Sequence, residues 1–434
     1  MASERRRGDD VLIIEGGAPL RGTVVPSGNK NEALPVIAAA LLVPGTVVID
    51  NVPRIRDVET LVRIVRDLGA RIEFTAEHTL TVDASALPAH RADSGLASEI
   101  RGSFLLAAPL LARQKRAVLP APGGDRIGRR RIDTHLLALR QLGADVHPGD
   151  PFVLVLDGSF RGGEVFLDEA SVTATETALM AAAVAQGETR ILNAASEPHV
   201  QGLCRALNAW GARIRGIGTN ALEVDGVDTL RGGPHRLGPD HIEIGSFAAL
   251  AAMTDGDMRI ADVIPDDLRM IRLVLSRLGV ETQMDGRDLL VPSGQKRAIT
   301  PDIGGAIPKV DDAPWPGFPA DLTSLALVLA TQCDGTVLIH EKLFESRLFF
   351  VDRLIAMGAR IVLCDPHRAV VIGPSRLHGT EMASPDIRAG MALIGAALAA
   401  EGRSVIHNVR QVDRGYERID TRLAALGARI KRES

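Results

Sequence analysis

The segment from Ala121 to His135, APGGDRIGRRRIDTH, concentrates side chains that could do chemistry. It holds four arginines, two aspartates and a histidine. Its glycines and proline predict a long, mobile connection, because glycine reaches left-handed backbone conformations without steric cost. A loop this charged could be ordinary solvated surface, or it could bind an anionic ligand. The rest of the chain decides between these interpretations.

Basic side chains recur at equivalent places along the chain, and several precede helices rich in small residues. Helix N-termini carry unpaired amides and a positive dipole end, so a cation there is unfavourable unless an anion or partner offsets it. The recurrence predicts a site for a small, highly charged anion that carries phosphate and carboxylate groups. The basic positions are Lys30, Arg101, Arg130, Arg347 and Arg414.

These residues sit in a chain that repeats itself six times. Each copy contains a small-residue helix, a short strand, a polar loop, an apolar-periodic helix that ends in glycine, and a further strand. Glycine after the last periodic residue is typical of a helix C-terminus before a strand. The second copy has extra length, which falls in the 121–135 loop, and a lengthened, charged loop favours a functional role. The marker glycines are Gly69, Gly143, Gly211, Gly279, Gly358 and Gly427.

Size and composition narrow the class of protein. A chain of 434 residues is too long for one ordinary core, so two domains with three copies each are expected. The net charge of −4 argues against general nucleic-acid binding, and no apolar run approaches a membrane span. The three cysteines form neither a disulfide framework nor a metal-ligand spacing. We therefore expect a reduced, cytoplasmic protein without metal.

Several motifs in the same order resemble the enolpyruvyl transferases, and the resemblance covers essentially the whole chain after its first ten residues. It implies an inside-out α/β barrel, with two similar domains each built of three βαβαββ repeats. The first domain would span 30–232, with the mobile loop 121–135, and the second 1–29 plus 233–434. The motifs are SGNKNEALP from Ser27, the 121–135 loop, FPADLTS around Asp321, FESRLF around Arg347, DIRAG around Arg388 and DRGYERI around Arg414.

The resemblance implies transfer of the enolpyruvyl group from phosphoenolpyruvate to a sugar hydroxyl, with release of phosphate and without any cofactor. The most similar branch uses the 3-hydroxyl of UDP-N-acetylglucosamine and begins peptidoglycan synthesis, which would link the chain to cell wall biogenesis, cell shape and cell division. Two alternatives stay open: another nucleotide or sugar acceptor in secondary metabolism, and a non-catalytic paralogue that binds a nucleotide sugar. The oligomeric state is not predicted.

The resemblance also assigns roles to individual residues. Asp125 would protonate the methylene carbon of phosphoenolpyruvate, Asp321 would accept the proton of the attacking hydroxyl, and Asp386 would lie beside the reacting carbons. Lys30 would be catalytic and would also bind phosphoenolpyruvate. The other phosphoenolpyruvate contacts would be Asn31, Arg101, Arg130, Arg347, Arg388 and Arg414. The nucleotide sugar would contact Asn31, Arg130, Arg131, Asp133, His135, Ser171, Val172, Thr173, Asp321 and Leu343.

Asp125 stands where most of the family has a cysteine, the target of the antibiotic fosfomycin, so the resemblance implies resistance. An aspartate must be protonated to act as an acid, and a free aspartate has a pKa of about 3.9. Arg126, Arg129 and Arg130 would favour the charged carboxylate, whereas bound phosphoenolpyruvate would favour the protonated one. We therefore expect an acid-shifted activity optimum.

A few residues depart from the family pattern near the acceptor. Glu169 stands in place of a lysine near the acceptor's diphosphate, Thr173 in place of a glycine and Arg131 in place of a proline. A reversed charge in direct contact should weaken binding by about 1–3 kcal/mol. Arg129 or Arg131 is expected to supply compensating charge.

Overall fold

The computed structural model describes residues 10–125 and 127–433, and these form two compact units. Unit 1 comprises the chain up to Pro26, the segment Asp125–Arg129 and the range Pro239–Ser434; unit 2 comprises Ser27–Gly124 and Arg130–Gly238. The division of the chain into domains 30–232 and 1–29 plus 233–434 remains a prediction. The compact units differ from them mainly in the 121–135 loop, whose residues 125–129 make their contacts within unit 1.

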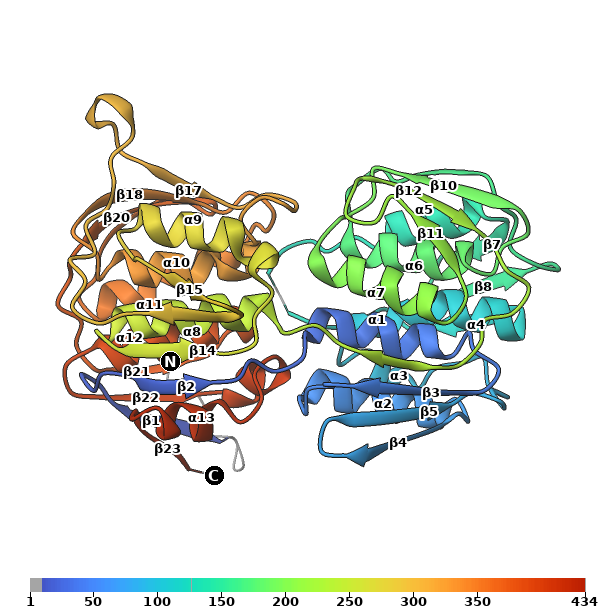
Figure 1. The fold of residues 1–434 in the computed structure, drawn as a ribbon, viewed down its shortest axis with the longest axis horizontal. Helices are drawn as coiled ribbons and strands as arrows, with labels where there is room; N and C mark the ends of the chain where they lie inside the picture. The colour runs from blue at the N-terminus through green and yellow to red at the C-terminus, as the bar shows by residue number, and fades with distance from the viewer. Residues whose placement is uncertain (1–9, 126, 434) are drawn as a thin grey trace. The chain divides into compact units, whose positions relative to one another are not determined.

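Unit 2 contains three sheets, one for each copy of the repeat (Figure 1). In each sheet, the strand that follows the small-residue helix pairs antiparallel with one strand of a hairpin. On its other side it lies parallel to an edge strand. In the second copy the parallel edge is reduced to one bridge, Arg91 with Val118. The sheets are β13(Pro234–Arg236)-β3(Thr46–Asp50)-β5(Thr79–Asp83)-β4(Arg71–Ala76), β6(Arg116–Leu119)-β8(Phe152–Leu156)-β7(Ala144–His147) and β11(Arg213–Arg215)-β12(Ala221–Asp225)-β10(Glu188–Leu192)-β9(Glu164–Phe166).

Unit 1 repeats this arrangement in three four-stranded sheets. The last sheet is completed by the start of the chain, because β1 pairs antiparallel with both β22 and β23. The sheets are β15(Gln283–Asp285)-β16(Asp288–Val291)-β14(Asp257–Ile260)-β2(Arg21–Val24), β17(Lys309–Asp311)-β18(Gly335–His340)-β20(Arg368–Gly373)-β19(Arg360–Asp365) and β21(Glu381–Ala383)-β22(Arg403–His407)-β1(Val11–Glu15)-β23(Arg429–Glu433).

The small-residue helices lie inside each unit, and the sheets surround them (Figure 1). In unit 1 they are α8(His241–Met253), α10(Thr323–Ala330) and α12(Ile387–Ala399). In unit 2 they are α1(Lys30–Ala40), α4(Ala107–Gln114) and α6(Val172–Ala182). Every residue of α8 and of α10 is buried, as is typical of helices that are apolar all round. Helices inside sheets confirm the expected inside-out α/β barrel.

A second, amphipathic helix in each copy ends at the marker glycine. All six marker glycines have positive φ, between 79° at Gly279 and 104° at Gly211, as glycine permits. These helices are α2(Arg56–Asp67), α5(Asp133–Gln141), α7(Pro198–Ala209), α9(Arg269–Arg277), α11(Val351–Ala356) and α13(Ile419–Ala425). Shorter helices are α3(Ser94–Ala97), η1(Arg101–Leu106), η2(Pro265–Leu268), η3(Ile303–Gly305), η4(Ala320–Leu322), η5(Arg347–Phe350) and η6(Val409–Arg414).

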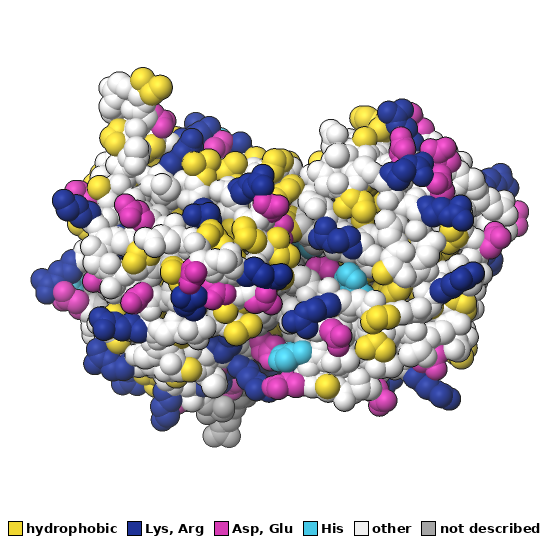
Figure 2. Space-filling model, viewed as in Figure 1, with side chains coloured by type: hydrophobic (Ala, Val, Ile, Leu, Met, Phe, Trp, Pro, Cys, Tyr) yellow, Lys and Arg dark blue, Asp and Glu magenta, His cyan; other side chains and the backbone are white. Residues whose placement is uncertain are grey.

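The surface of each unit carries side chains of both charge signs, which alternate over the face drawn in Figure 2. Within residues 10–125 and 127–433, no helix combines the length and the apolar composition that a bilayer crossing requires. The same residues contain no group of three or more histidine, cysteine, aspartate or glutamate side chains placed to hold a metal ion.

Candidate active site

In unit 1, Asp321 lies between two buried arginines. Arg347 donates one hydrogen bond of 3.1 Å to Oδ1, and Arg388 donates two to Oδ2, from Nε at 2.9 Å and from its terminal nitrogen at 2.8 Å. The guanidinium groups are 2% and 4% exposed, whereas the Asp321 side chain is 28% exposed. Two cations therefore stabilise the charged carboxylate while one side of it stays accessible.

Both arginines keep donors without a partner. Within the described residues, NH1 of Arg347 and NH1 of Arg388 are buried and make no hydrogen bond. Leaving such a donor unsatisfied costs about 1–3 kcal/mol, and more for a charged group. Guanidinium groups match carboxylate and phosphate oxygens. An oxyanion beside Asp321 would satisfy these donors.

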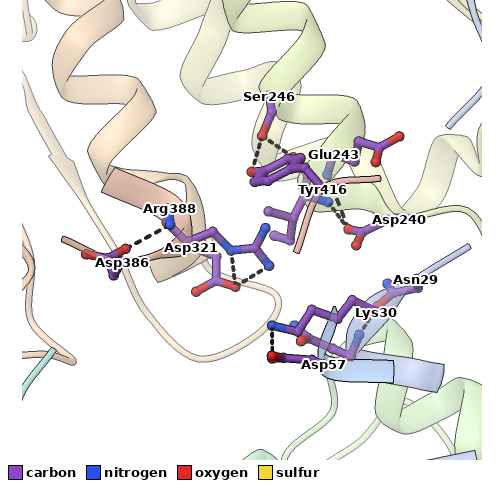
Figure 3. Close-up of polar contacts among 12 residues, drawn as sticks. Asn29, Lys30, Asp57, Asp240, Glu243, Ser246, Asp321, Asp386, Arg388 and Tyr416 are labelled. Carbon is purple, nitrogen blue, oxygen red and sulfur yellow. Dashed lines mark hydrogen bonds and ion pairs between the residues drawn. The ribbon is translucent and has the colours of Figure 1, made fainter. Parts of the chain in front are cut away.

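Arg388 is positioned by the start of α12. Asp386 is the N-cap residue of this helix, and its carboxylate accepts from the backbone amides of Arg388 and Ala389 at 2.8 and 2.9 Å. The Arg388 guanidinium lies 5.4 Å from the ring centroid of Tyr416, whose hydroxyl is 2.9 Å from Oγ of Ser246 (Figure 3). Burial raises the pKa of Asp386 above its ordinary value. The cap therefore fixes the direction in which Arg388 reaches Asp321.

A buried carboxylate that the sequence did not single out supports Arg347. Glu341 is 0% exposed, and its Oε2 lies 3.6 Å from Nε of Arg347. Burial raises the pKa of Glu341 to about 8. Glu341 follows β18 directly, but one acidic residue after a strand gives no signal of burial, because its depth depends on the packing of other elements.

Asp125 belongs to the same unit and pairs with Arg414. The distance from its Oδ1 to NH1 of Arg414 is 2.5 Å, and the two side chains are 13% and 14% exposed. From the sequence we expected the nearby Arg126, Arg129 and Arg130 to favour its charged form; the structure adds an ion pair with a residue 289 positions away. Arg126 lies outside the described residues. Asp125 thus lies beside a cation that could also bind a substrate anion.

In unit 2, Lys30 is the first residue of α1, and its Nζ lies 2.8 Å from Oδ2 of Asp57 (Figure 3). Both side chains are buried. The N-cap residue Asn29 accepts from the amides of Asn31 and Glu32 at 2.9 and 3.2 Å. The carboxylate of Asp57 therefore offsets the unfavourable position of a lysine at the start of a helix.

Arg101 and Arg130 lie close enough to affect each other. Burial, together with the charge of Arg130, lowers the pKa of Arg101 to about 10, and the charge of Glu169 opposes this shift. Gly124 packs between them, since a Cβ there would lie 3.1 Å from Cβ of Arg101 and 3.4 Å from NH1 of Arg130. Two neighbouring guanidinium groups favour a shared anion.

Several residues expected to contact the nucleotide sugar lie around α5 and α6. The helix α5 begins at Asp133, so the loop that we expected to reach residue 135 ends before it. His135 belongs to the first turn of this helix and is buried. Its Nδ1 and Nε2 lie 2.9 Å from the hydroxyls of Thr177 and Thr173, and burial lowers its pKa to about 3. The imidazole is therefore neutral. Its expected contact with the nucleotide sugar remains a prediction.

Arg131, one of the departures from the family pattern, belongs to an exposed network. Arg131 pairs with Asp133 at 3.3 Å and with Asp168 at 3.0 Å, and Asp168 also accepts from Thr134 at 2.7 Å. The exposed Glu169 follows directly. The positive charge of Arg131, which we expected to compensate Glu169, is therefore already paired with Asp133 and Asp168.

The remaining predicted contacts are spread over two units. Ser171 is the N-cap residue of α6, which starts at Val172, and Asn31 is half-buried in the first turn of α1. Leu343, in unit 1, is 44% exposed, and its amide donates to Asp312 at 3.2 Å. Unit 1 thus contains Asp125, Asp321, Leu343, Arg347, Asp386, Arg388 and Arg414, and unit 2 contains the other predicted residues.

Comparisons with known proteins agree over the whole chain. Residues 14–423 match the family described as EPSP synthase (3-phosphoshikimate 1-carboxyvinyltransferase). The chain is 57% identical over 420 residues to a UDP-N-acetylglucosamine 1-carboxyvinyltransferase of Bradyrhizobium diazoefficiens, which covers 97% of each chain. A protein of the same name from Treponema denticola is 54% identical and covers 96% of this chain and 98% of its own.

Two solved structures resemble the fold. The enolpyruvyl transferase NikO from Streptomyces tendae has a TM-score of 0.87 at 28% identity, over 98% of this chain and 99% of that one. EPSP synthase from Acinetobacter baumannii has a TM-score of 0.75 at 18% identity, over 98% of this chain and 100% of that one. At this low identity the second likeness concerns the fold alone.

Proposed function

The chain belongs to the EPSP synthase family of enolpyruvyl transferases, and we propose that it transfers the enolpyruvyl group of phosphoenolpyruvate to the 3-hydroxyl of UDP-N-acetylglucosamine. The observation that carries the chemistry is the Asp321 cluster, where a charged carboxylate lies between two buried arginines that each keep a free donor. The names of the relatives support the choice of acceptor. The reaction would belong to cytoplasmic peptidoglycan synthesis.

In the proposed reaction, the sugar oxygen attacks C2 of phosphoenolpyruvate while its proton passes to Asp321, and Asp125 gives a proton to the C3 methylene. Loss of one C3 proton and of phosphate, with cleavage of the bond between C2 and the phosphate oxygen, then restores the double bond. The net change replaces the phosphate on C2 by the sugar oxygen. No metal or organic cofactor enters this balance.

The anionic groups of phosphoenolpyruvate would be bound by the basic residues of both units. We propose that Arg347 and Arg388 bind phosphoenolpyruvate with the donors that have no partner among the residues that the structure describes. Arg414 would bind it by exchanging its ion pair with Asp125 for one with a substrate oxyanion. When a substrate oxyanion takes over Arg414, the Asp125 carboxyl is released from this ion pair. Lys30, Asn31, Arg101 and Arg130 are the proposed contacts from unit 2.

A second candidate keeps the chemistry and changes the acceptor. It rests on Glu169, Thr173 and Arg131, because Arg131, one of the two arginines expected to compensate Glu169, is engaged by Asp133 and Asp168. The binding of the nucleotide sugar by Arg131, Asp133, His135, Ser171, Val172, Thr173 and Leu343 is part of the first proposal, and a different acceptor would change these contacts first.

Phosphate release from phosphoenolpyruvate tests both candidates. We would measure it with UDP-N-acetylglucosamine, other UDP-sugars, UMP and shikimate 3-phosphate, at about pH 5.5 and about pH 7.5. Release with UDP-N-acetylglucosamine alone supports the first proposal, and preference for another acceptor supports the second. Folded protein that releases no phosphate with any acceptor would contradict both and favour a non-catalytic paralogue.

A further inference from the structure

The segment Ile127–Arg129 docks by its backbone onto the two residues that precede η5. The amide of Ser346 donates to the carbonyl of Ile127 at 3.0 Å. In return, Oε2 of Glu345 accepts from the amide of Arg129 at 3.1 Å. These two hydrogen bonds run in opposite directions, so they fix the segment in one register against Glu345 and Ser346. We call this pair of contacts the Glu345 clamp.

Gly128 lets the two segments approach closely. Its φ is +138°, a conformation that favours glycine. A Cβ there would lie 1.9 Å from Oε2 of Glu345 and 3.0 Å from its backbone nitrogen. The preceding residue, Ile127, is 4% exposed, so the segment is buried at this point. Any larger residue at position 128 would push the segment off Glu345.

Each half of the clamp lies close in the chain to a residue of the proposed mechanism. On one side, Asp125, two residues before the clamped segment, pairs with Arg414. On the other side, Arg347 follows Ser346 directly and binds Asp321. A single stretch, Glu345–Arg347, therefore contacts both the loop of the proposed acid and the side chain of the proposed base.

We propose that Glu345 is a positioning residue, whose carboxylate holds the segment Ile127–Arg129 so that Asp125, two residues before this segment, is placed for proton transfer. The catalytic part of this inference rests on the proposed function, and the clamp itself does not. Glu345 touches no reacting atom; it acts through the backbone of Arg129. Its removal should therefore lower kcat and leave the binding of UDP-N-acetylglucosamine nearly unchanged.

The first measurement is amide hydrogen exchange in peptides that cover residues 124–130, on the full-length protein. Glu345→Ala removes the acceptor and should speed exchange there by about tenfold, as expected for loss of a charge-assisted hydrogen bond. Glu345→Gln keeps an acceptor oxygen and should restore most of the protection. Glu281→Ala is the matched control, because it removes an exposed carboxylate of unit 1 outside the clamp.

The second measurement is kcat for phosphate release. Glu345→Ala and Gly128→Ala should each lower it about tenfold. The double variant should be no slower than Gly128→Ala alone, because both changes break the same contact. Glu345→Gln should recover most of the rate, which a loss of general stability would not explain.

Unchanged exchange at 124–130 in Glu345→Ala would overturn the clamp, and additive losses of kcat in the double variant would overturn the shared contact. Faster exchange with unchanged kcat would overturn the positioning role. If the exchange result holds but no acceptor supports phosphate release in the unmodified protein, the clamp stands, whereas the proposed function and the positioning role both fail.

Discussion

The two units present their predicted site residues in different electrostatic settings. In unit 1 the carboxylates and guanidinium groups pair with one another in buried positions, as Asp321 does with Arg347 and Arg388. In unit 2, Lys30 and Asp57 form one buried pair, but Arg101 and Arg130 lie near each other, and Arg131 forms an exposed network with Asp133 and Asp168. Buried, mutually paired groups hold a fixed geometry, whereas exposed pairs contribute little and tolerate substitution.

This contrast suggests a division of labour. We infer that unit 1 supplies the groups that need exact placement for bond making, and that the exposed network of unit 2 is where acceptor preference changes. It also explains why the departures from the family pattern, Glu169, Thr173 and Arg131, all lie in unit 2. The predictions below test this division.

The largest effect is expected for Asp321→Asn. The variant keeps the size of the side chain and one acceptor oxygen toward the arginines, but its amide nitrogen donates rather than accepts, and the side chain cannot take up a proton. Turnover should fall by about a hundred- to ten-thousand-fold, as is typical of a lost general base, while UDP-N-acetylglucosamine still binds. Steady-state kinetics with calorimetric titration of the acceptor would check this, and unchanged turnover would refute the assignment.

Asp125 should make activity depend on pH. Because the acid must carry a proton, kcat/KM should decline by up to about tenfold per pH unit on the alkaline side of an acid-shifted optimum. A pH–rate profile would show this decline, and a rate that rises steadily above neutrality would contradict it.

The variant Asp125→Cys should weaken the decline of the rate at alkaline pH and should make the enzyme sensitive to fosfomycin. An active but insensitive variant would mean that Asp125 is misplaced in the mechanism.

Glu341→Gln should change the pH dependence of stability. The folded-state pKa of about 8 lies above the ordinary 4.5, so the folded protein holds a proton that the unfolded chain releases. Between about pH 4.5 and pH 8 the unmodified protein therefore loses stability as the pH rises. The variant should lack this loss, which amounts to up to about 5 kcal/mol. Urea denaturation at several pH values would check it, and parallel curves for the two proteins would contradict it.

The smallest effect is expected at the exposed rim of unit 2. Glu169→Lys should lower KM for UDP-N-acetylglucosamine by about five- to hundredfold if residue 169 meets the diphosphate, on the scale of about 1–3 kcal/mol for a charged contact. The value of kcat should hardly change. Glu169→Gln is the matched control and should give an intermediate KM. Equal KM values in all three proteins would show that Glu169 is tolerated and would remove the electrostatic reason for another acceptor.

Much of the fold followed from local signals. The small-residue stretches became the buried helices, and the six marker glycines took the left-handed conformation that ends a helix. The family and the inside-out barrel are confirmed. The start of α5 at Asp133 was missed, because the charged run before it gives no cap signal and Ile132 makes no side-chain cap bond. The roles of the site residues stay predictions.

The sequence by itself determined the residue types of the site, their order and the repeat that places them at the ends of elements, because periodicity and glycine caps act over a few residues. Only the tertiary structure decided which charges meet. Arg414, 289 positions away in the chain, pairs with Asp125, and Glu341 is buried beside Arg347. Arg131 is engaged by Asp168. Ion pairs depend on distance in space, and contacts between residues far apart in the chain form only when the sheets and helices pack.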